Sequence, residues 1–257
     1  MTHRHLFSSF VFVWLLLLSA CSQEDIVKID EQAELYMLSK DYVIAHRGYW
    51  NKWDVPENSR SALERALALK IYGVEFDVRQ TNDGKLVVYH DATYNGLVIE
   101  NSSYDELCTK TLANGETIPL LEEFLSIRNK ADTSVKLIID IKKCSIDSLV
   151  QQINEYGFQN EVIYITFTKS YCQQLAKLGY GASTYYSSNS TTPSEIKEMG
   201  FGGVCYNSTF LMANPDYIDT AKSLNIKIMV WTVNNYNSIH DYSLKGVYVI
   251  TDNPKEF

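Results

Sequence analysis

The sequence is poor in proline, glycine and basic residues, and each shortage excludes a class of protein. Five prolines and 12 glycines among 257 residues are too few for a fibrous or disordered chain, and they fit one well-packed globular domain. Lysine and arginine number 23 against 31 acidic residues, which gives a formal net charge of -8. Because this charge repels phosphate backbones and no basic cluster offers a local exception, we expect no nucleic-acid partner.

Cysteine is also scarce, and the five cysteines form no metal-binding motif. Four of them show neither CxxC spacing nor a partnering histidine, which argues against a zinc site. These four are Cys108, Cys144, Cys172 and Cys205. We interpret them as small buried hydrophobic residues. Disulfides are the alternative if the domain is exported, and the sequence does not select among the pairings.

The longest apolar run lies near the N-terminus, over residues 6–18, and is too short to span a bilayer comfortably. Basic residues precede this run at 3–5, and the sequence Leu-Ser-Ala-Cys follows at 18–21. That ending resembles the lipobox of bacterial lipoproteins. The resemblance implies a signal peptide over residues 1–20 and a lipidated N-terminus at Cys21. An ordinary secretory signal followed by a chance cysteine is the alternative.

The segment after the apolar run is short and acidic, so residues 21–40 suit a lipidated N-terminus with a solvated tether. Residues 41–257 are then predicted to form one domain. No later segment reaches the ~18 consecutive apolar residues that a spanning helix needs. We therefore expect the mature protein to be anchored in the bacterial cell envelope by its lipid, facing the periplasm or the cell exterior.

From about Tyr42 the sequence alternates short β-branched or aromatic runs with amphipathic helical stretches, which is typical of βα units around a parallel sheet. The first unit contains a strand at 42–45, a helix capped by Asn58 or Ser59, and a strand at 74–78. Residues 85–89 are also strand-like. The few residues before them leave no room for a crossover helix, so an antiparallel hairpin is predicted.

Six further strands are predicted, at residues 137–141, 162–166, 182–186, 204–207, 228–232 and 247–251. Helical patterns separate them, for example at 146–156, 170–178, 194–199 and 215–224. About eight parallel strands result, which is the number that closes a (β/α)8 TIM barrel of ~250 residues. A small insertion has room after the second barrel strand, between Asp91 and about Glu116. A doubly wound open sheet is the alternative.

Polar residues with catalytic potential fall at the ends of the predicted strands, where the active site of such a barrel lies. His46 and Arg47 follow the first strand, and His90 ends the hairpin arm. Glu75 and Asp77 are two residues apart, so both side chains point to the same face of the second strand. Two histidines on the same rim as several carboxylates indicate acid–base chemistry.

Asp140 and Lys142 repeat the two-residue spacing on the next barrel strand, which brings a third carboxylate to this rim. Three convergent carboxylates suit Mg2+ or Ca2+ better than zinc. The alternative is that the carboxylates form ion pairs with Arg47, Arg79 and Lys142 and hold no metal.

Two features of the loop after the first strand are open to more than one interpretation. The sequence Pro-Glu-Asn-Ser at 56–59 indicates a helix start, with a direct active-site role for Glu57 as the alternative. The aromatic residues Tyr49, Trp50 and Trp53 can line the pocket, touch lipid or pack in the core.

Taken in order, these motifs resemble those of the glycerophosphodiester phosphodiesterase family. Its pattern of HRG, PEN(T/S), ExD, TxDG and HD is present at 46–48, 56–59, 75–77, 81–84 and 90–91. The match continues with Asp-Ile-Lys at 140–142, Trp-Thr-Val-Asn at 231–234 and Thr-Asp-Asn-Pro at 251–254. Each motif alone is weak, but the ordered set covers nearly the whole mature chain and is very specific.

The resemblance implies a TIM barrel with a small insertion that hydrolyses glycerophosphodiesters to glycerol 3-phosphate and an alcohol. It also implies that His46 and His90 are the catalytic acid and base. Arg47 and Lys142 would contact the phosphate, and Trp231 would line the pocket.

The resemblance further implies a divalent cation, Ca2+ or Mg2+, at Glu75, Asp77 and Asp140. The family usually has glutamate where this chain has Asp140, one methylene shorter. The cation would therefore lie deeper, be held through water or bind weakly. The alternative functions are a phosphodiesterase of lysophospholipids or phosphoinositides, and a surface lipoprotein that binds a ligand without catalysis.

Overall fold

The computed structural model describes residues 40–51, 55–131 and 133–254. The predicted signal peptide, the lipidation site Cys21 and Trp53 lie outside these ranges, and so does the tether up to residue 39. None of the described helices combines the length and the apolarity that a membrane-spanning segment requires.

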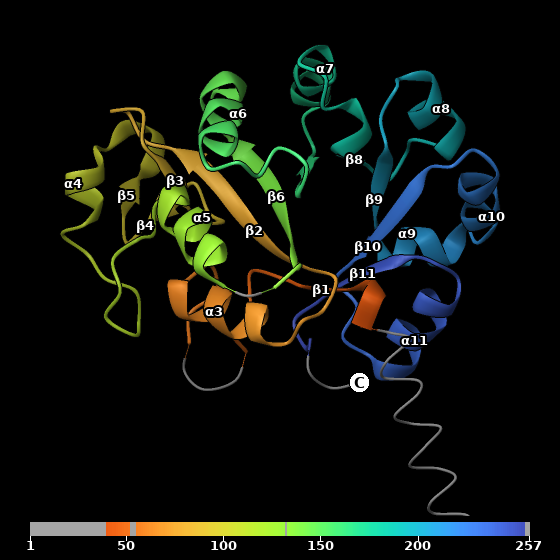
Figure 1. The fold of residues 1–257 in the computed structure, drawn as a ribbon, viewed down its shortest axis with the longest axis horizontal. Coiled ribbons are helices and arrows are strands. Elements are labelled where there is room, and N and C mark those ends of the chain that lie inside the picture. Colours follow the sequence, from red (N-terminus) through yellow and green to blue (C-terminus); the bar gives the residue numbers. More distant parts are fainter. Residues whose placement is uncertain (1–39, 52–54, 132, 255–257) are drawn as a thin grey trace, which may run out of the picture. The chain divides into compact units, whose positions relative to one another are not determined.

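Eight parallel strands form a closed barrel, which confirms the predicted (β/α)8 architecture and excludes the open sheet (Figure 1). Strand β1 pairs in parallel with both β2 and β11, and these two pairings close the sheet. The barrel strands are β1 (Val43–Ala45), β2 (Gly73–Gln80), β6 (Lys136–Lys143), β7 (Val162–Thr166), β8 (Thr184–Ser187), β9 (Gly203–Asn207), β10 (Lys227–Trp231) and β11 (Tyr248–Thr251).

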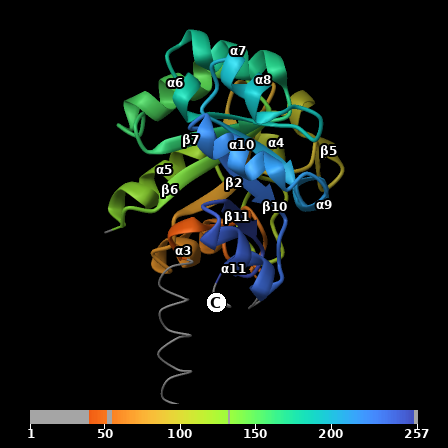
Figure 2. The ribbon, with the colours of Figure 1, turned by 90° about the vertical axis from the view of Figure 1, so that its right-hand side faces the viewer.

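Helices surround the strands, as two views at right angles show (Figures 1 and 2). In chain order they are α3 (Arg60–Ala68), α5 (Leu121–Lys130), α6 (Ile146–Glu155), α7 (Lys169–Lys177), α8 (Pro193–Glu198), α9 (Ser208–Ala213), α10 (Asp216–Ser223) and α11 (Tyr236–Leu244). The cap of α3 is Ser59, whose side chain accepts from the amide of Ala62. Asn58, the other predicted cap, instead bonds to Asp77.

Strand residues alternate between two hydrophobic cores. Those that point outward pack under the helices in the larger core, while the barrel interior is filled by residues such as Ile44, Ile138 and Met229. On β6 the next inward-pointing residue after Ile138 is Asp140, and on β2 the inward positions are Glu75 and Asp77. The apolar filling therefore gives way to charged side chains toward the C-terminal end of the barrel.

The segment between β2 and α5 forms the predicted insertion, which Figure 1 shows beside β2. Its first strand, β3 (Leu86–Val88), pairs antiparallel with β2, so the predicted hairpin is confirmed. A second hairpin follows, β4 (Thr93–Tyr94) with β5 (Leu97–Val98), and then η2 (Ile99–Asn101) and α4 (Tyr104–Leu107). The insertion has its own small core of Val87, Tyr94, Ile99, Leu107 and Ile118.

Some local predictions change in detail. The predicted strand at 182–186 begins at Thr184, because Gly181–Ser183 form a 3-10 turn, η3. The 3-10 turns η1 (Lys40–Tyr42) and η2 lie earlier in the chain. Tyr49 is buried in the larger core, so of the three interpretations given for this aromatic residue, packing in the core is correct. Trp50 donates its indole N–H to the carbonyl of His46. The four cysteines after residue 40 are free, and three of them are buried.

Candidate active site

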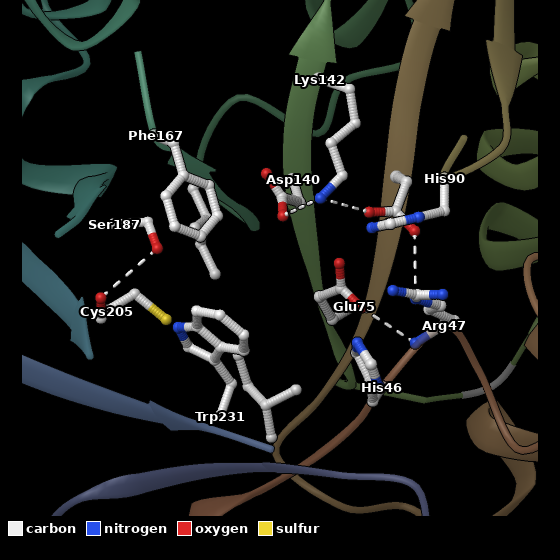
Figure 3. A pocket seen from close by; sticks show the side chains of 13 residues that line it. His46, Arg47, Glu75, His90, Asp140, Lys142, Phe167, Ser187, Cys205 and Trp231 are labelled. Atoms are coloured by element: carbon white, nitrogen blue, oxygen red, sulfur yellow. Dashed lines mark hydrogen bonds and ion pairs between the residues drawn. The ribbon is translucent and has the colours of Figure 1, made fainter. Parts of the chain in front are cut away.

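One pocket at the C-terminal end of the barrel is lined by all eight predicted catalytic, substrate-binding and metal residues: His46, Arg47, Glu75, Asp77, His90, Asp140, Lys142 and Trp231. The cavity has a volume of about 160 Å3. Figure 3 shows the charged side chains on one side, with Phe167, Cys205 and Trp231 facing them. The pocket therefore has a charged half and a largely apolar half.

Glu75, Asp77 and Asp140 are buried, and each offers an oxygen that lies within 4.8 Å of those of the other two. Asp77 on β2 is the direct neighbour of Asp140 on β6, which explains how two strands bring the carboxylates together. Oδ1 of Asp140 is buried and has no hydrogen-bond partner. A buried carboxylate oxygen without a partner is energetically unfavourable, and a bound cation would remove that cost. The all-oxygen set of ligands fits Mg2+ or Ca2+. The shorter side chain of Asp140 still reaches the cluster.

Two cationic side chains also touch these carboxylates. Nζ of Lys142 lies 2.8 Å from Oδ2 of Asp140 and 3.1 Å from Oδ1 of Asp77. Nε of Arg47 lies 3.5 Å from Oδ2 of Asp77. Two of the three ion-pair partners suggested by the sequence are therefore correct. Arg79 is not, because it donates to the carbonyl of His90 instead.

The pKa values of the three carboxyl groups shift in different directions. Burial, followed by the repulsion of Asp77, raises the pKa of Glu75 to about 8. Burial also raises the pKa of Asp140, although Lys142 opposes it. At Asp77, burial is outweighed by Lys142 and Arg47, so its pKa lies below the ordinary value. A further cation at this point would favour ionisation of all three groups.

A β-bulge in β6 lies at Lys142. Val78 on β2 pairs with Ile141 on β6, but the next residue, Arg79, pairs with Lys143. Lys142 is therefore an extra residue in β6, and such a bulge changes the direction of the side chains around it. Lys142 reaches into the pocket, while Lys143 turns to an ion pair with Glu100.

His46 is oriented by a carboxylate from the other end of the chain. Its Nδ1 lies 2.6 Å from Oδ1 of Asp252, whose Oδ2 accepts from the side chain of Asn234 at 2.8 Å. Burial would raise the pKa of Asp252, but these two hydrogen bonds hold it below the ordinary value. An ionised carboxylate only accepts, so Nδ1 of His46 carries the proton and Nε2 is left for a ligand.

The protonated form of His46 is favoured by its surroundings. Burial alone would lower the pKa of this histidine. The hydrogen bond to Asp252 and the charge of Glu75 outweigh that effect, and the pKa lies above the ordinary value. The surroundings of His46 therefore stabilise the imidazolium that forms when the ring takes up a proton.

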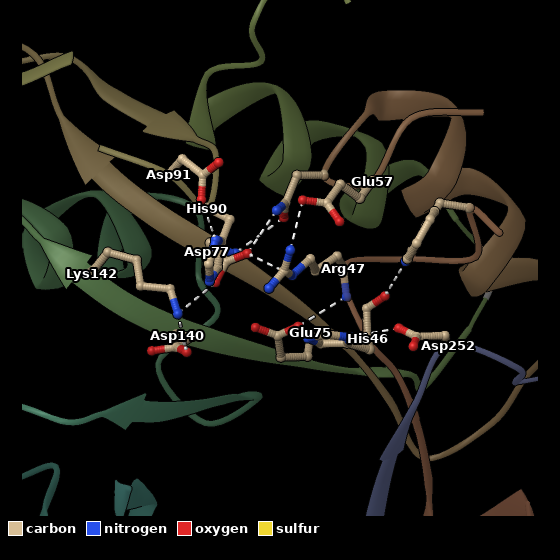
Figure 4. A network of polar contacts seen from close by, with 12 residues as sticks. His46, Arg47, Glu57, Glu75, Asp77, His90, Asp91, Asp140, Lys142 and Asp252 are labelled. Atoms are coloured by element: carbon tan, nitrogen blue, oxygen red, sulfur yellow. Dashed lines mark hydrogen bonds and ion pairs between the residues drawn. The ribbon is translucent and has the colours of Figure 1, made fainter. Parts of the chain in front are cut away.

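His90 has a similar partner but a more open position. Its Nδ1 lies 2.7 Å from Oδ1 of Asp91, and its side chain is 35% exposed, compared with 18% for His46. Figure 4 shows His90 beside Asp77, and His46 beside Glu75. The two imidazoles therefore reach the carboxylate cluster from the loops that follow two different strands, β1 and β3.

The turn after β1 explains the HRG motif. Arg47 has a left-handed φ of 55°, and its amide donates to Oε2 of Glu75 at 2.9 Å. Gly48 is needed because a Cβ there would lie 2.7 Å from Cβ of Ala62 on α3. The Arg47 guanidinium donates to Oε1 of Glu57 at 2.7 Å. Glu57 therefore holds Arg47, and it is absent from the lining of the pocket.

Three residues that contact the site had no active-site role assigned from the sequence. Asn58 donates through Nδ2 to Oδ2 of Asp77 at 2.7 Å and accepts from the Asp77 amide. Asp91 and Asp252 are the carboxylate partners of the two histidines. All three belong to motifs of the family pattern, and this membership is the sequence signal that could have marked them as site residues. Of the three contacts, the one between Asp252 and His46 depends on the closed barrel.

The apolar half contains Phe167, which was not predicted to line the pocket. Phe167, directly after β7, packs edge-on against Trp231 with ring centres 5.7 Å apart. Nζ of Lys142 lies 6.0 Å from the centre of the Phe167 ring, which is half exposed. An aromatic residue after a strand gives no signal in the sequence that it borders a pocket.

The sequence matches the family described as the glycerophosphoryl diester phosphodiesterase family over residues 46–256. A glycerophosphodiester phosphodiesterase of Caldanaerobacter subterraneus is 26% identical over 237 residues, which are 84% of this chain and 96% of that protein. The family match covers all the residues that line the pocket.

Solved structures resemble this fold closely. A glycerophosphodiester phosphodiesterase from Parabacteroides distasonis has a TM-score of 0.79 at 35% identity, and the match covers 84% of this chain and 95% of that one. A phosphodiesterase of Oleispira antarctica, solved in complex with the product sn-glycerol-3-phosphate, has a TM-score of 0.73 at 21% identity. That match covers 85% of this chain and 96% of the other, and it concerns the fold alone.

Proposed function

Because the chain belongs to the glycerophosphoryl diester phosphodiesterase family, we propose that its pocket uses a divalent cation and two histidines to hydrolyse glycerophosphodiesters. The chain is a glycerophosphodiester phosphodiesterase. One observation supports the mechanism most strongly. Two histidines, each with Nδ1 against a carboxylate, line the same pocket as three buried carboxylates.

The charged half of the pocket suits a phosphodiester. Glu75, Asp77 and Asp140 would hold Mg2+ or Ca2+, which when bound would neutralise charge on the phosphate oxygens. Arg47 and Lys142 would contact those oxygens directly, because both line the pocket and both stay protonated beside their carboxylate partners. Fixed positive charge of this kind favours the transition state, in which negative charge builds on the phosphoryl group.

The histidines would move the protons of the reaction. The attacking oxygen, from water or from the neighbouring glycerol hydroxyl, loses a proton to Nε2 of one histidine as its bond to phosphorus forms. The bond to the leaving alcohol breaks, and the other histidine gives that oxygen a proton. Asp252 and Asp91 hold Nδ1 of each ring, so that Nε2 is the nitrogen presented to the substrate. With water as the nucleophile, the products are glycerol 3-phosphate and an alcohol. With the glycerol hydroxyl, the alcohol leaves first and a cyclic phosphate forms, which water opens in a second step with the two histidines exchanging roles.

A direct test of this function is product release by the purified domain. With glycerophosphocholine as substrate, we expect choline and glycerol 3-phosphate in equal amounts. A chelator should stop the reaction, and added Mg2+ or Ca2+ should restore it. Lysophosphatidylcholine and glycerophosphoinositol in parallel identify the preferred substrate. Full turnover in the chelator would contradict the role of the carboxylates, and release of choline from lysophosphatidylcholine alone would contradict the substrate class.

We also propose that the protein is held on a membrane by lipid on Cys21. The support is the Leu-Ser-Ala-Cys sequence at 18–21 after an apolar run. Each buried methylene of an acyl chain contributes about 0.8 kcal/mol, so several chains give a stable anchor. The anchor would hold the barrel in the bacterial cell envelope, facing the periplasm or the cell exterior.

A further inference from the structure

Arg79 touches a proposed catalytic residue without entering the pocket. It lies near the end of β2, is largely buried, and is absent from the residues that line the cavity. Its Nε donates to the backbone carbonyl of His90 at 2.9 Å. The contact is with the main chain of His90, so Arg79 can influence where the imidazole stands without touching the substrate.

His90 stands just beyond the regular part of the β2–β3 hairpin. Strand β3 ends at Val88, and the amide of Tyr89 donates to the carbonyl of Asp77 at 3.0 Å. The next residue is His90, and its carbonyl accepts from Nε of Arg79. The main chain of His46 is held by the barrel itself, because its amide donates to the carbonyl of Thr251 at 2.9 Å.

Arg79 is itself held by the insertion. Its guanidinium lies 3.6 Å from Oε1 of Glu100, whose Oε2 pairs with Lys143 on β6 at 2.5 Å. Glu100 follows Ile99, which is fully buried in the core of the insertion. The carbonyl of Ser102 in the same segment accepts from Asn82 in the β2–β3 turn. A packed segment therefore fixes the carboxylate that Arg79 contacts.

We infer that Arg79, held by Glu100, is a positioning residue that sets the location of the His90 ring. The inference rests on the proposed function, in which His90 transfers a proton. A displacement of about 1 Å at a reacting group costs about 100-fold in rate, so the bond to the His90 carbonyl affects turnover. The insertion then contributes to catalysis through this bond, although none of its own side chains beyond His90 lines the pocket.

The test is a double-mutant cycle between Arg79 and His90, measured with a glycerophosphodiester at saturating metal. Arg79→Met should lower kcat by about 10- to 100-fold, with KM within about twofold, because Arg79 lies outside the pocket. In a His90→Ala background the same change should cost nothing further, because the group that it positions is gone. Lys143→Met, which removes only the exposed end of the Glu100 ion pair, should stay close to the wild type.

Each outcome separates the inference from the proposed function. An equal loss from Arg79→Met in both backgrounds overturns the inference, because Arg79 would then act through something other than His90. Unchanged kcat in Arg79→Met beside an impaired His90→Ala also overturns it, and leaves the proposed function standing. Near wild-type turnover in His90→Ala contradicts the proposed function itself. If Arg79→Met does not unfold cooperatively on heating, the variant is not properly folded, and Glu100→Gln replaces it in the same two backgrounds. We expect a smaller loss of kcat from Glu100→Gln.

Discussion

His46 and Asp252 are 206 positions apart in the sequence, and Nδ1 of the histidine lies 2.6 Å from Oδ1 of the aspartate. The contact exists because β1 pairs with β11, where Ala45 and Thr251 are direct neighbours. His46 and Asp252 are the next residues along the two strands. Closing the barrel therefore assembles this half of the site, and the orientation of His46 depends on the last strand.

Asp252→Asn should lower turnover and shift the pH dependence. The Asp252 carboxylate stabilises the protonated form of His46, and its loss lowers the pKa of this histidine. The limb of the kcat/KM profile that reports His46 should therefore move to lower pH, whether His46 acts as acid or as base. We expect kcat to fall by about 10- to 1,000-fold, because an amide no longer fixes the tautomer.

The exposed residue Asp219 supplies the matched control for this change. Its side chain is 90% exposed, so Asp219→Asn makes the same chemical substitution away from the pocket. The control should keep the wild-type pH profile. A His46 limb that stays in place, or moves to higher pH, in Asp252→Asn would show that this carboxylate does not set the pKa of His46.

Metal binding should release a proton from Glu75. The pKa of this group is about 8 before a cation binds, so at neutral pH the ion competes with a proton. Affinity for Mg2+ or Ca2+ should rise about tenfold per pH unit up to about pH 8 and then level off. Calorimetry in two buffers of different ionisation enthalpy measures the released protons. Glu75→Gln should bind the ion more weakly with no release, and a pH-independent affinity in the wild type would contradict the prediction.

Asp140→Glu should reduce the metal concentration that the enzyme needs. Oδ2 of Asp140 is engaged by Lys142, which leaves the buried Oδ1 for the cation. A side chain one methylene longer can bring its oxygen closer to the cation, and we expect half-maximal activity at about tenfold less metal. Asp140→Asn, the control of similar size, should need more metal than the wild type. An unchanged or higher requirement in Asp140→Glu would rule out side-chain length as the cause.

The barrel and its charged rim could be predicted because they follow from local patterns. Alternating strands and helices specify βα units, and two-residue spacing puts Glu75 with Asp77, and Asp140 with Lys142, on one face. The hairpin followed from the shortness of the turn before β3. These features need only the period of each element and the rule that the sites of such barrels lie at strand ends.

The remaining contacts depend on register and closure, which a single sequence does not encode locally. The sequence suggested Arg79 as a partner of the pocket carboxylates, but the insertion offers Arg79 the carbonyl of His90 and the carboxylate of Glu100 instead. Asn58 was a candidate helix cap, but its left-handed φ of 57° turns the side chain to Asp77. Phe167 lies at the site because the closed barrel places the end of β7 across from Trp231.

Cys21→Ala should release the protein from membranes and leave the barrel active. The substitution removes the proposed acylation site, which lies 25 residues before His46 and outside the described barrel. Fractionation of cells should move the variant from the membrane pellet to the soluble fraction, with turnover per molecule unchanged. A Ser22→Ala variant, one residue away, should remain in the pellet. A Cys21→Ala protein that still sediments with membranes would refute lipid at this cysteine as the anchor.

The central claim is that two histidines on different strands transfer the protons of phosphodiester hydrolysis, and kcat of the two single variants tests it most directly. His46→Ala and His90→Ala should each lose about two to four orders of magnitude in kcat with glycerophosphocholine at saturating metal. Both variants should keep the wild-type unfolding temperature within a few degrees and bind the cation. Near wild-type kcat in either folded, metal-loaded variant would contradict the account and remove that histidine from the mechanism.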